Sequence, residues 1–210
     1  MNLLQKNFSK IYSKNLWGNK GEEFMNKRKN TKFYSGGGTD PDNDRDNRYI
    51  NLVQEFISRP DVHTVVEVGC GDWEVSSRID WNGVQYTAYD VVQELIDYNQ
   101  SKFGKENINF VCSDIMQKNN VTADLLIVKD VFQHLPSSFC KKFIWFIPDR
   151  FKYNIITNDY GTNNADIPFG GWQGNDFTLP PFSMKCELLI HWDQKFKEAG
   201  IKHTVSILKP

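Results

Sequence analysis

The sequence lacks the features that mark several large classes of protein. It contains no uninterrupted apolar run of the roughly 18 residues that a membrane-spanning helix requires. Charge of one sign is not in excess, because 25 basic and 26 acidic residues leave a net charge of −1. No overall basic field would therefore attract a nucleic acid or an anionic membrane.

The cysteine pattern excludes two further classes. The chain contains four scattered cysteines and no C-x-x-C pair, which argues against a disulfide framework and against a zinc site: Cys70, Cys112, Cys140 and Cys186. The first residues, MNLLQKNFSK, are too polar for a secretory signal. We therefore expect a cytoplasmic protein with reduced thiols.

What is present suits one globular unit with an N-terminal attachment. With 210 residues, of which 40% are apolar, the chain is long enough to bury a core. Residues 1–60 are expected to form a cap of helices and loops, with helices near 7–14 and 46–58 and glycine-marked breaks at Trp17-Gly18 and at 35–39. Residues 61–210 are expected to form the core.

From His63 onward, apolar strand-like runs alternate with helical patterns, which predicts a mostly parallel sheet with helices on both faces. The fold class is therefore α/β, a three-layer Rossmann-like sandwich. Strands are expected at 63–69, 85–90, 108–113, 123–128 and 153–158, and helices at 73–79, 91–103 and 136–151. A terminal antiparallel strand pair at 187–191 and 202–208 should enclose a short helix at 192–199.

Each predicted parallel strand ends in an acidic residue: Glu67, Asp90, Asp114, Asp130 and Asp159. Because parallel strands end at the same edge of a sheet, these carboxylates should gather there, where such sheets bind ligands. Asp90 follows Glu67 by 23 residues (90 − 67), close to the offset of about 20 at which an acid meets a ribose in nucleotide-binding βαβ units. A carboxylate is well suited to accept both hydroxyls of a ribose.

These motifs together resemble those of the class I S-adenosylmethionine-dependent methyltransferases. EVGCGDW (67–73) is similar to the first motif of that family, Tyr89-Asp90 to its ribose-binding acid, SDI (113–115) to its adenine-contacting motif and KDVFQHLP (129–136) to the motif after its fourth strand. One residue departs from the pattern, since Trp73 replaces the third glycine of G-x-G-x-G. GGW (170–172) and PPF (180–182), with the glycine breaks before the core, resemble a less characterised branch of the same superfamily.

The resemblance implies a set of residues that bind S-adenosylmethionine and release S-adenosylhomocysteine: Glu67, Gly69, Gly71, Asp90, Val91, Asp114, Ile115, Lys129 and Asp130. Two alternatives stay open. Asp114 is a contact to the adenine or the cap of a short helix. A charged turn without a ligand would also explain Glu67.

Catalytic and substrate-binding residues are expected near the ends of the fourth and fifth strands. His134 is a candidate general base or a structural histidine before Pro136, and Asp130 and Asp159 are further catalytic candidates. A divalent metal on Asp130, Asn158 and Asp159 is the less favoured alternative, and no metal is the prediction. The loop at 161–182 is expected to cover the substrate or to be a packed structural loop, with three substrate contacts predicted: Tyr34, Asp166 and Trp172.

The function predicted from the resemblance is methyl transfer from S-adenosylmethionine to a small polar metabolite, most simply the oxygen of a sugar or of a nucleotide-linked sugar. Transfer to the nitrogen of a small amine is an alternative. Two other classes remain open: a nicotinamide-dependent oxidoreductase, disfavoured because Glu74 stands where G-x-G-x-x-G needs glycine, and a non-catalytic cofactor-binding partner protein. Neither a nucleic acid nor a membrane is an expected partner.

Overall fold

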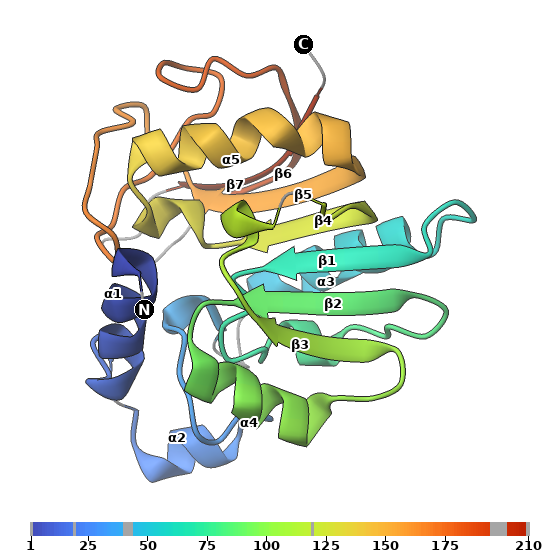
Figure 1. Ribbon diagram of the computed structural model, residues 1–210, viewed down its shortest axis with the longest axis vertical. Coiled ribbons are helices and arrows are strands. Elements are labelled where there is room, and N and C mark those ends of the chain that lie inside the picture. Colours follow the sequence, from blue (N-terminus) through green and yellow to red (C-terminus); the bar gives the residue numbers. More distant parts are fainter. Residues whose placement is uncertain (1, 19, 40–43, 119, 194–200, 209–210) are drawn as a thin grey trace.

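The computed structural model describes residues 2–18, 20–39, 44–118, 120–193 and 201–208. Seven strands form one sheet in the order β3-β2-β1-β4-β5-β7-β6, with β1 to β5 parallel and β6 and β7 antiparallel to their neighbours (Figure 1). The strands are β1 Thr64–Val68, β2 Gln85–Asp90, β3 Ile108–Cys112, β4 Ala123–Lys129, β5 Phe151–Asp159, β6 Cys186–Asp193 and β7 Ile201–Ile207. The predicted α/β class and the terminal antiparallel pair are confirmed.

The central strand β4 shows why this sequence makes a sandwich. Its residues from Leu125 to Val128 are all fully buried, so both faces of the strand must be covered. Leu125 and Ile127 pack in one core cluster, and Leu126 and Val128 pack in the other. Alternate side chains of one strand thus anchor two separate helical layers.

Helices cover the two faces of the sheet. In Figure 1, α3 (Asp44–Ile57) lies behind the sheet, α4 (Gln93–Phe103) lies along its β3 edge, and α5 (Ser137–Arg150) lies in front of it. Each of these three helices has an apolar stripe at helical spacing, such as the buried Phe143, Ile144 and Ile147 of α5. Among the residues that the structure describes, none of the helices combines the length and the apolar character needed to cross a bilayer.

The N-terminal segment lies against the edge where the parallel strands end. α1 (Leu3–Ser13) runs beside the carboxyl ends of β1 and β2 in Figure 1, and α2 (Glu22–Asn26) follows it. A reciprocal pair of hydrogen bonds between Asn2 and Gln5 caps the start of α1. The buried face of the helix, which includes Leu4, Ile11 and Tyr12, therefore closes over the ligand edge of the sheet.

Three expected helices differ from the structure. The helix expected at 73–79 is only a 3-10 turn at Ser76–Arg78, since Trp73 has a left-handed backbone (φ 56°) that an α-helix cannot contain. α1 begins at Leu3, before the expected start at 7, because its cap is Asn2. Of the helix expected at 192–199, residues 192 and 193 belong to β6 and the rest lies outside the described residues.

Candidate active site

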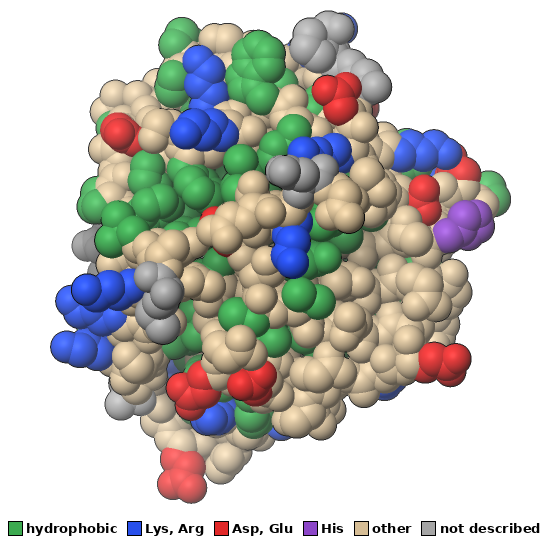
Figure 2. All heavy atoms as spheres, viewed as in Figure 1, with side chains coloured by type: hydrophobic (Ala, Val, Ile, Leu, Met, Phe, Trp, Pro, Cys, Tyr) green, Lys and Arg blue, Asp and Glu red, His purple; other side chains and the backbone are tan. Residues whose placement is uncertain are grey.

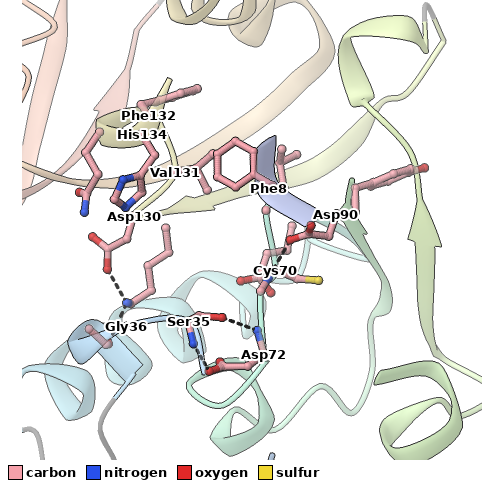
Figure 3. A pocket seen from close by; sticks show the side chains of 18 of the residues that line it. Phe8, Ser35, Gly36, Cys70, Asp72, Asp90, Asp130, Val131, Phe132 and His134 are labelled. Carbon is pink, nitrogen blue, oxygen red and sulfur yellow. Dashed lines mark hydrogen bonds and ion pairs between the residues drawn. The ribbon is translucent and has the colours of Figure 1, made fainter. Parts of the chain in front are cut away.

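A cavity of about 1070 Å³ opens where the strands β1 to β4 end, between the glycine turn after β1 and the helices α1 and α5. Figure 3 shows Asp90 and Cys70 on one side of it, Asp130 and His134 on the other, and Phe8 of α1 between them. On the face shown in Figure 2, hydrophobic side chains gather over the region between α1 and α5. The cavity thus joins an acidic floor to apolar walls.

Two positions of the turn after β1, Gly69 and Gly71, leave no room for a side chain. Gly69 and Gly71 both have positive φ, 71° and 53°. A Cβ on Gly69 would lie 2.4 Å from Cγ2 of Val131, and one on Gly71 would lie 2.6 Å from Oγ of Ser35. The two glycines are therefore required by the turn itself and by the segments that pack over it.

Asp90 is fixed at the end of β2 by backbone donors. Its Oδ2 accepts the N–H of Gly71 at 3.1 Å, and its Oδ1 accepts the N–H of Val92 at 3.1 Å. These bonds favour the carboxylate, but burial is the larger effect and raises the pKa of Asp90 above its ordinary value. A carboxylate has about four acceptor positions, so both oxygens retain capacity for a further donor.

Asp72 ties the glycine turn to the N-terminal segment, an arrangement that the sequence analysis missed. Its Oδ2 accepts from Nη2 of Arg28 at 2.5 Å and from the N–H of Ser35 at 2.7 Å, and Oγ of Ser35 accepts the N–H of Asp72 at 2.7 Å. Oγ of Ser35 also lies 2.7 Å from the hydroxyl of Tyr12 in α1. The N-terminal segment and the glycine turn after β1 are therefore joined in one network of hydrogen bonds.

Glu67 and Asp114 both line the cavity. Glu67 is 3% exposed, and burial raises its pKa to about 7 although hydroxyl donors from Tyr86 and Ser76 oppose the shift. Asp114 caps the 3-10 turn that follows β3, because its Oδ1 accepts the N–H of Met116 at 3.0 Å. The capping alternative for Asp114 is thus observed, and its contact to an adenine stays a prediction.

The ends of β4 and β5 bring the catalytic candidates together. Asp130 has φ 57° and its Oδ2 accepts from Nζ of Lys129 at 2.7 Å. Nδ1 of His134 lies 2.8 Å from the carbonyl oxygen of Gly171, and the Trp17 ring lies over the imidazole at 5.3 Å between centroids. Asp159, at the end of β5, accepts from Nε1 of Trp172 at 2.8 Å.

The comparisons with known proteins agree with this geometry. Residues 66–143 match the model of the family described as methyltransferase domain. This stretch of the chain thus matches a methyltransferase domain, and the whole chain has the fold of solved methyltransferases. The magnesium protoporphyrin IX methyltransferase of Synechocystis PCC 6803, solved with S-adenosylhomocysteine, superimposes with a TM-score of 0.66 at 13% identity, over 98% of this chain and 100% of that one. The N-methyltransferase NodS of Bradyrhizobium japonicum WM9 gives 0.63 at 13% identity, over 90% and 98%.

Curated relatives of the methyltransferase domain match over shorter stretches. Malonyl-[acyl-carrier protein] O-methyltransferase of Acetivibrio thermocellus is 31% identical over 72 residues, which are 33% of this chain and 25% of the relative. Ubiquinone biosynthesis O-methyltransferase of Coxiella burnetii is 28% identical over 91 residues, 41% and 38% of the two chains. The match thus spans about a quarter to two fifths of the length of these relatives.

The cavity gathers the predicted cofactor residues but none of the three predicted substrate residues. Every predicted cofactor residue lines it, as do His134, Asp130 and Asp159. Tyr34, Asp166 and Trp172 do not line it: Tyr34 packs under Arg28, Asp166 accepts from the N–H and hydroxyl of Ser137 at the start of α5, and Trp172 is 57% exposed beside Asp159. Their contact with a substrate stays a prediction.

The metal alternative gains no support from the described residues around the cavity. Within the described ranges, no three His, Cys, Asp or Glu side chains converge as metal ligands. Of the three candidate ligands, Asp130 pairs with Lys129, Asp159 accepts from Trp172, and the amide of Asn158 donates to the backbone oxygen of Asp159. These side chains are engaged within the protein rather than arranged around a common point.

Four apolar residues near the start of the N-terminal cap line the cavity and were not predicted. Leu4, Phe8, Tyr12 and Trp17 all reach it from the first 18 residues. The helical spacing of Leu4, Phe8 and Tyr12 was the available signal, since three apolar residues four apart form one face of a helix. What that face covers could not be read from the sequence.

Proposed function

We propose that this protein transfers a methyl group from S-adenosylmethionine to a small acceptor in the cavity at the carboxyl ends of β1 to β4. The observation that carries the proposal is the carboxylate of Asp90, held by backbone N–H groups beside the glycine turn and facing a large cavity. Solved structures of the same fold support it, because the magnesium protoporphyrin IX methyltransferase was crystallised with S-adenosylmethionine or S-adenosylhomocysteine and NodS with S-adenosylhomocysteine.

The residues present fit this cofactor. Both oxygens of Asp90 retain acceptor capacity for a ribose diol. Val91, Ile115 and Phe8 supply apolar surface next to it for an adenine ring. Glu67 lies on the acidic floor of the cavity, where a positive charge is favoured. When bound, S-adenosylmethionine supplies an electrophilic methyl group on a positively charged sulfur.

The size of the cavity leaves room for an acceptor beside the cofactor. Pockets that hold one drug-sized ligand measure about 300–1,000 Å³, and this one measures about 1070 Å³. We propose a hydroxyl-bearing acceptor, such as a sugar or a nucleotide-linked sugar, because Asp130, Gln133 and His134 supply polar groups at the β4 end of the cavity. The curated relatives named as O-methyltransferases support oxygen as the acceptor atom.

His134 is our candidate for the base that receives the proton of the acceptor hydroxyl. A carbonyl oxygen only accepts, so the contact with Gly171 requires the proton of a neutral imidazole to sit on Nδ1. The basic lone pair is then on Nε2. The packing of Trp17 on the ring holds this orientation. Such a base contributes typically about 10²–10⁴-fold to the rate.

The outer segments of the chain are proposed to enclose the reaction. Residues 1–60 act as a cap, since α1 lines the cavity and Ser35 is bonded to the glycine turn. The loop 161–182 acts as a cover on the acceptor side, bonded to the β4 end through Gly170 and Gln173. The four cysteines stand as free thiols, which supports a cytoplasmic location.

Calorimetric titration with S-adenosylmethionine, S-adenosylhomocysteine and NAD⁺ tests the proposal. We expect micromolar binding of the first two and a loss of at least about tenfold in affinity for Asp90→Asn, which removes a charged acceptor of ribose hydroxyls. Asp97→Asn, on the exposed face of α4, is the matched control and should bind as the wild type does. Binding of NAD⁺ alone would favour an oxidoreductase, and binding of none of the three would favour a non-catalytic partner protein.

A further inference from the structure

Trp73 occupies the backbone position of the third glycine in the motif, and it is held there by its own contacts. Its φ of 56° is one that glycine adopts easily and a bulky residue rarely does. The indole is 4% exposed and packs against the rings of Tyr86, Phe103 and Phe110, at centroid distances of 5.9, 5.1 and 5.1 Å. An unfavourable backbone conformation that is retained in a buried turn calls for a compensating contact.

That contact leads from Trp73 to the floor of the cavity. Nε1 of Trp73 donates to the hydroxyl of Tyr86 at 2.8 Å. Because the tryptophan nitrogen only donates, the hydroxyl of Tyr86 accepts there and directs its own hydrogen to Oε2 of Glu67. The two buried aromatic residues therefore form a directed chain of hydrogen bonds that ends on a carboxyl group lining the cavity.

The second oxygen of Glu67 is held in the same way. Its Oε1 accepts from the hydroxyl of Ser76 at 3.0 Å, and the backbone oxygen of Ser76 accepts from Nε1 of Trp81 at 2.8 Å. Each oxygen of Glu67 thus has its own hydroxyl donor. Two donors aimed at two oxygens suit the ionised form of the group better than the neutral form.

The groups around Glu67 have opposing effects on its pKa. Lys129 of β4 favours the carboxylate, whereas Asp90 at the end of β2 disfavours it, and burial is the largest effect. The result is a pKa raised to about 7. Cys70 and Tyr86, the other titratable groups beside it, have pKa values raised by burial and so remain neutral there. The donor from Tyr86 is therefore one of the few effects that keep Glu67 charged.

We propose that Trp73 and Tyr86 are positioning residues that hold Glu67 on the cavity floor and thereby set a preference of the site for S-adenosylmethionine over S-adenosylhomocysteine. The inference rests on the proposed function. The two ligands differ in one positive charge, on the sulfur that loses its methyl group. An ionised Glu67 on the cavity floor attracts that charge, and the attraction is lost for the uncharged thioether of the product. The site would in this way release product more readily than it releases substrate.

Tyr86→Phe tests the inference, because it removes the hydroxyl and keeps the ring. In the unliganded protein, carbon-13 NMR of labelled glutamate carboxyls should place the titration of Glu67 at a higher pH in this variant than in the wild type. Calorimetry at pH 7 should show that the ratio of the two dissociation constants, product over substrate, falls by about threefold or more. Raising the pH toward 9 should restore much of that ratio, since Glu67 then ionises without the donor.

Three further variants separate positioning from general damage. Trp73→Phe keeps an aromatic ring without the N–H donor, and it should shift both readouts in the same direction by a smaller amount. Glu67→Gln should remove the pH dependence of the ratio. Tyr153→Phe is the matched control, because its hydroxyl bonds to Asp61 and Tyr153 does not line the cavity, and it should change neither readout.

The outcomes distinguish this inference from the proposed function. A wild-type protein that binds neither ligand overturns the proposed function, and the titration of Glu67 in the unliganded variants still tests the chain of hydrogen bonds. An unchanged titration of Glu67 in Tyr86→Phe overturns the inference. So does a shifted titration accompanied by equal weakening of both ligands at every pH.

Discussion

Arg28 and Asp72 form a buried ion pair that joins two distant parts of the sequence. Both side chains are essentially inaccessible to solvent, and Arg28 also donates to the backbone and hydroxyl oxygens of Thr39. Removing one partner of such a pair leaves an uncompensated charge, which costs about 3–5 kcal/mol. We therefore expect Arg28→Met to lower the free energy of unfolding by that amount in urea denaturation.

The control and the rescue make this prediction specific. Arg59→Met removes a partly exposed arginine that stacks on Phe56 and Tyr153, and it should cost about 1 kcal/mol or less. Asp72→Asn combined with Arg28→Met should recover part of the loss, because the double variant buries no unpaired charge. A double variant as unstable as the sum of the two single variants would contradict the role of the pair.

At the residue scale, the sequence predicted which residues gather at the strand ends better than it predicted contacts between distant parts of the chain. Glu67, Gly69, Gly71 and Asp90 belong to motifs whose spacing fixes where they lie relative to a strand end, and all of them line the cavity. The partner of Asp72 lies 44 residues earlier in the chain, and no periodicity indicates such a contact. The same holds for Trp73, whose link to Glu67 passes through Tyr86 on another strand.

At the scale of whole elements, strands were predicted within a few residues and helices less well. The strands are short apolar runs with clear ends, such as QYTAYD, which is β2 as predicted. The helix expected after the glycine turn failed because a single residue with positive φ cannot be recognised when it is tryptophan rather than glycine. The role of α1 depends on tertiary packing, which helical spacing does not reveal.

The prediction at the scale of elements concerns helix α1. Phe8 reaches into the cavity between Val131 and Asp90 in Figure 3, so its ring should cover bound cofactor. We expect Phe8→Ala to weaken binding of S-adenosylmethionine by about tenfold, the effect of losing about 1.5 kcal/mol of buried apolar contact, chiefly through faster dissociation.

Leu3→Ala is the matched change on the same helix, because Leu3 is 63% exposed. It should leave the dissociation rate unchanged in a stopped-flow displacement experiment. Equal effects of the two substitutions would mean that α1 acts only through its own stability and does not touch the cofactor.

At the scale of the whole molecule, the acids that line the cavity lower the free energy of unfolding as the pH rises. Glu67 and Asp72 are buried and Asp90 is partly buried, and the pKa values of all three acids are raised, in each case mainly by desolvation. Between the ordinary pKa of Glu67, 4.5, and its folded value of about 7, the folded protein holds a proton that the unfolded chain releases. The free energy of unfolding therefore falls as the pH rises through that window, and Glu67 alone accounts for about 3 kcal/mol of the fall.

Urea denaturation at pH 5, 6, 7 and 8 measures this slope. We expect the wild type to lose stability steadily up to about pH 7 and then to level, and Glu67→Gln to show a clearly shallower slope over the same range. Saturating S-adenosylmethionine should offset the loss at pH 8, because a ligand at about 100 times its dissociation constant adds about 2.7 kcal/mol to the folded state. A wild type whose stability rises from pH 5 to pH 7 would contradict the assignment. The acids of the cavity would then be stabilised in their charged form by the protein alone, and the cationic cofactor would not be needed to balance them.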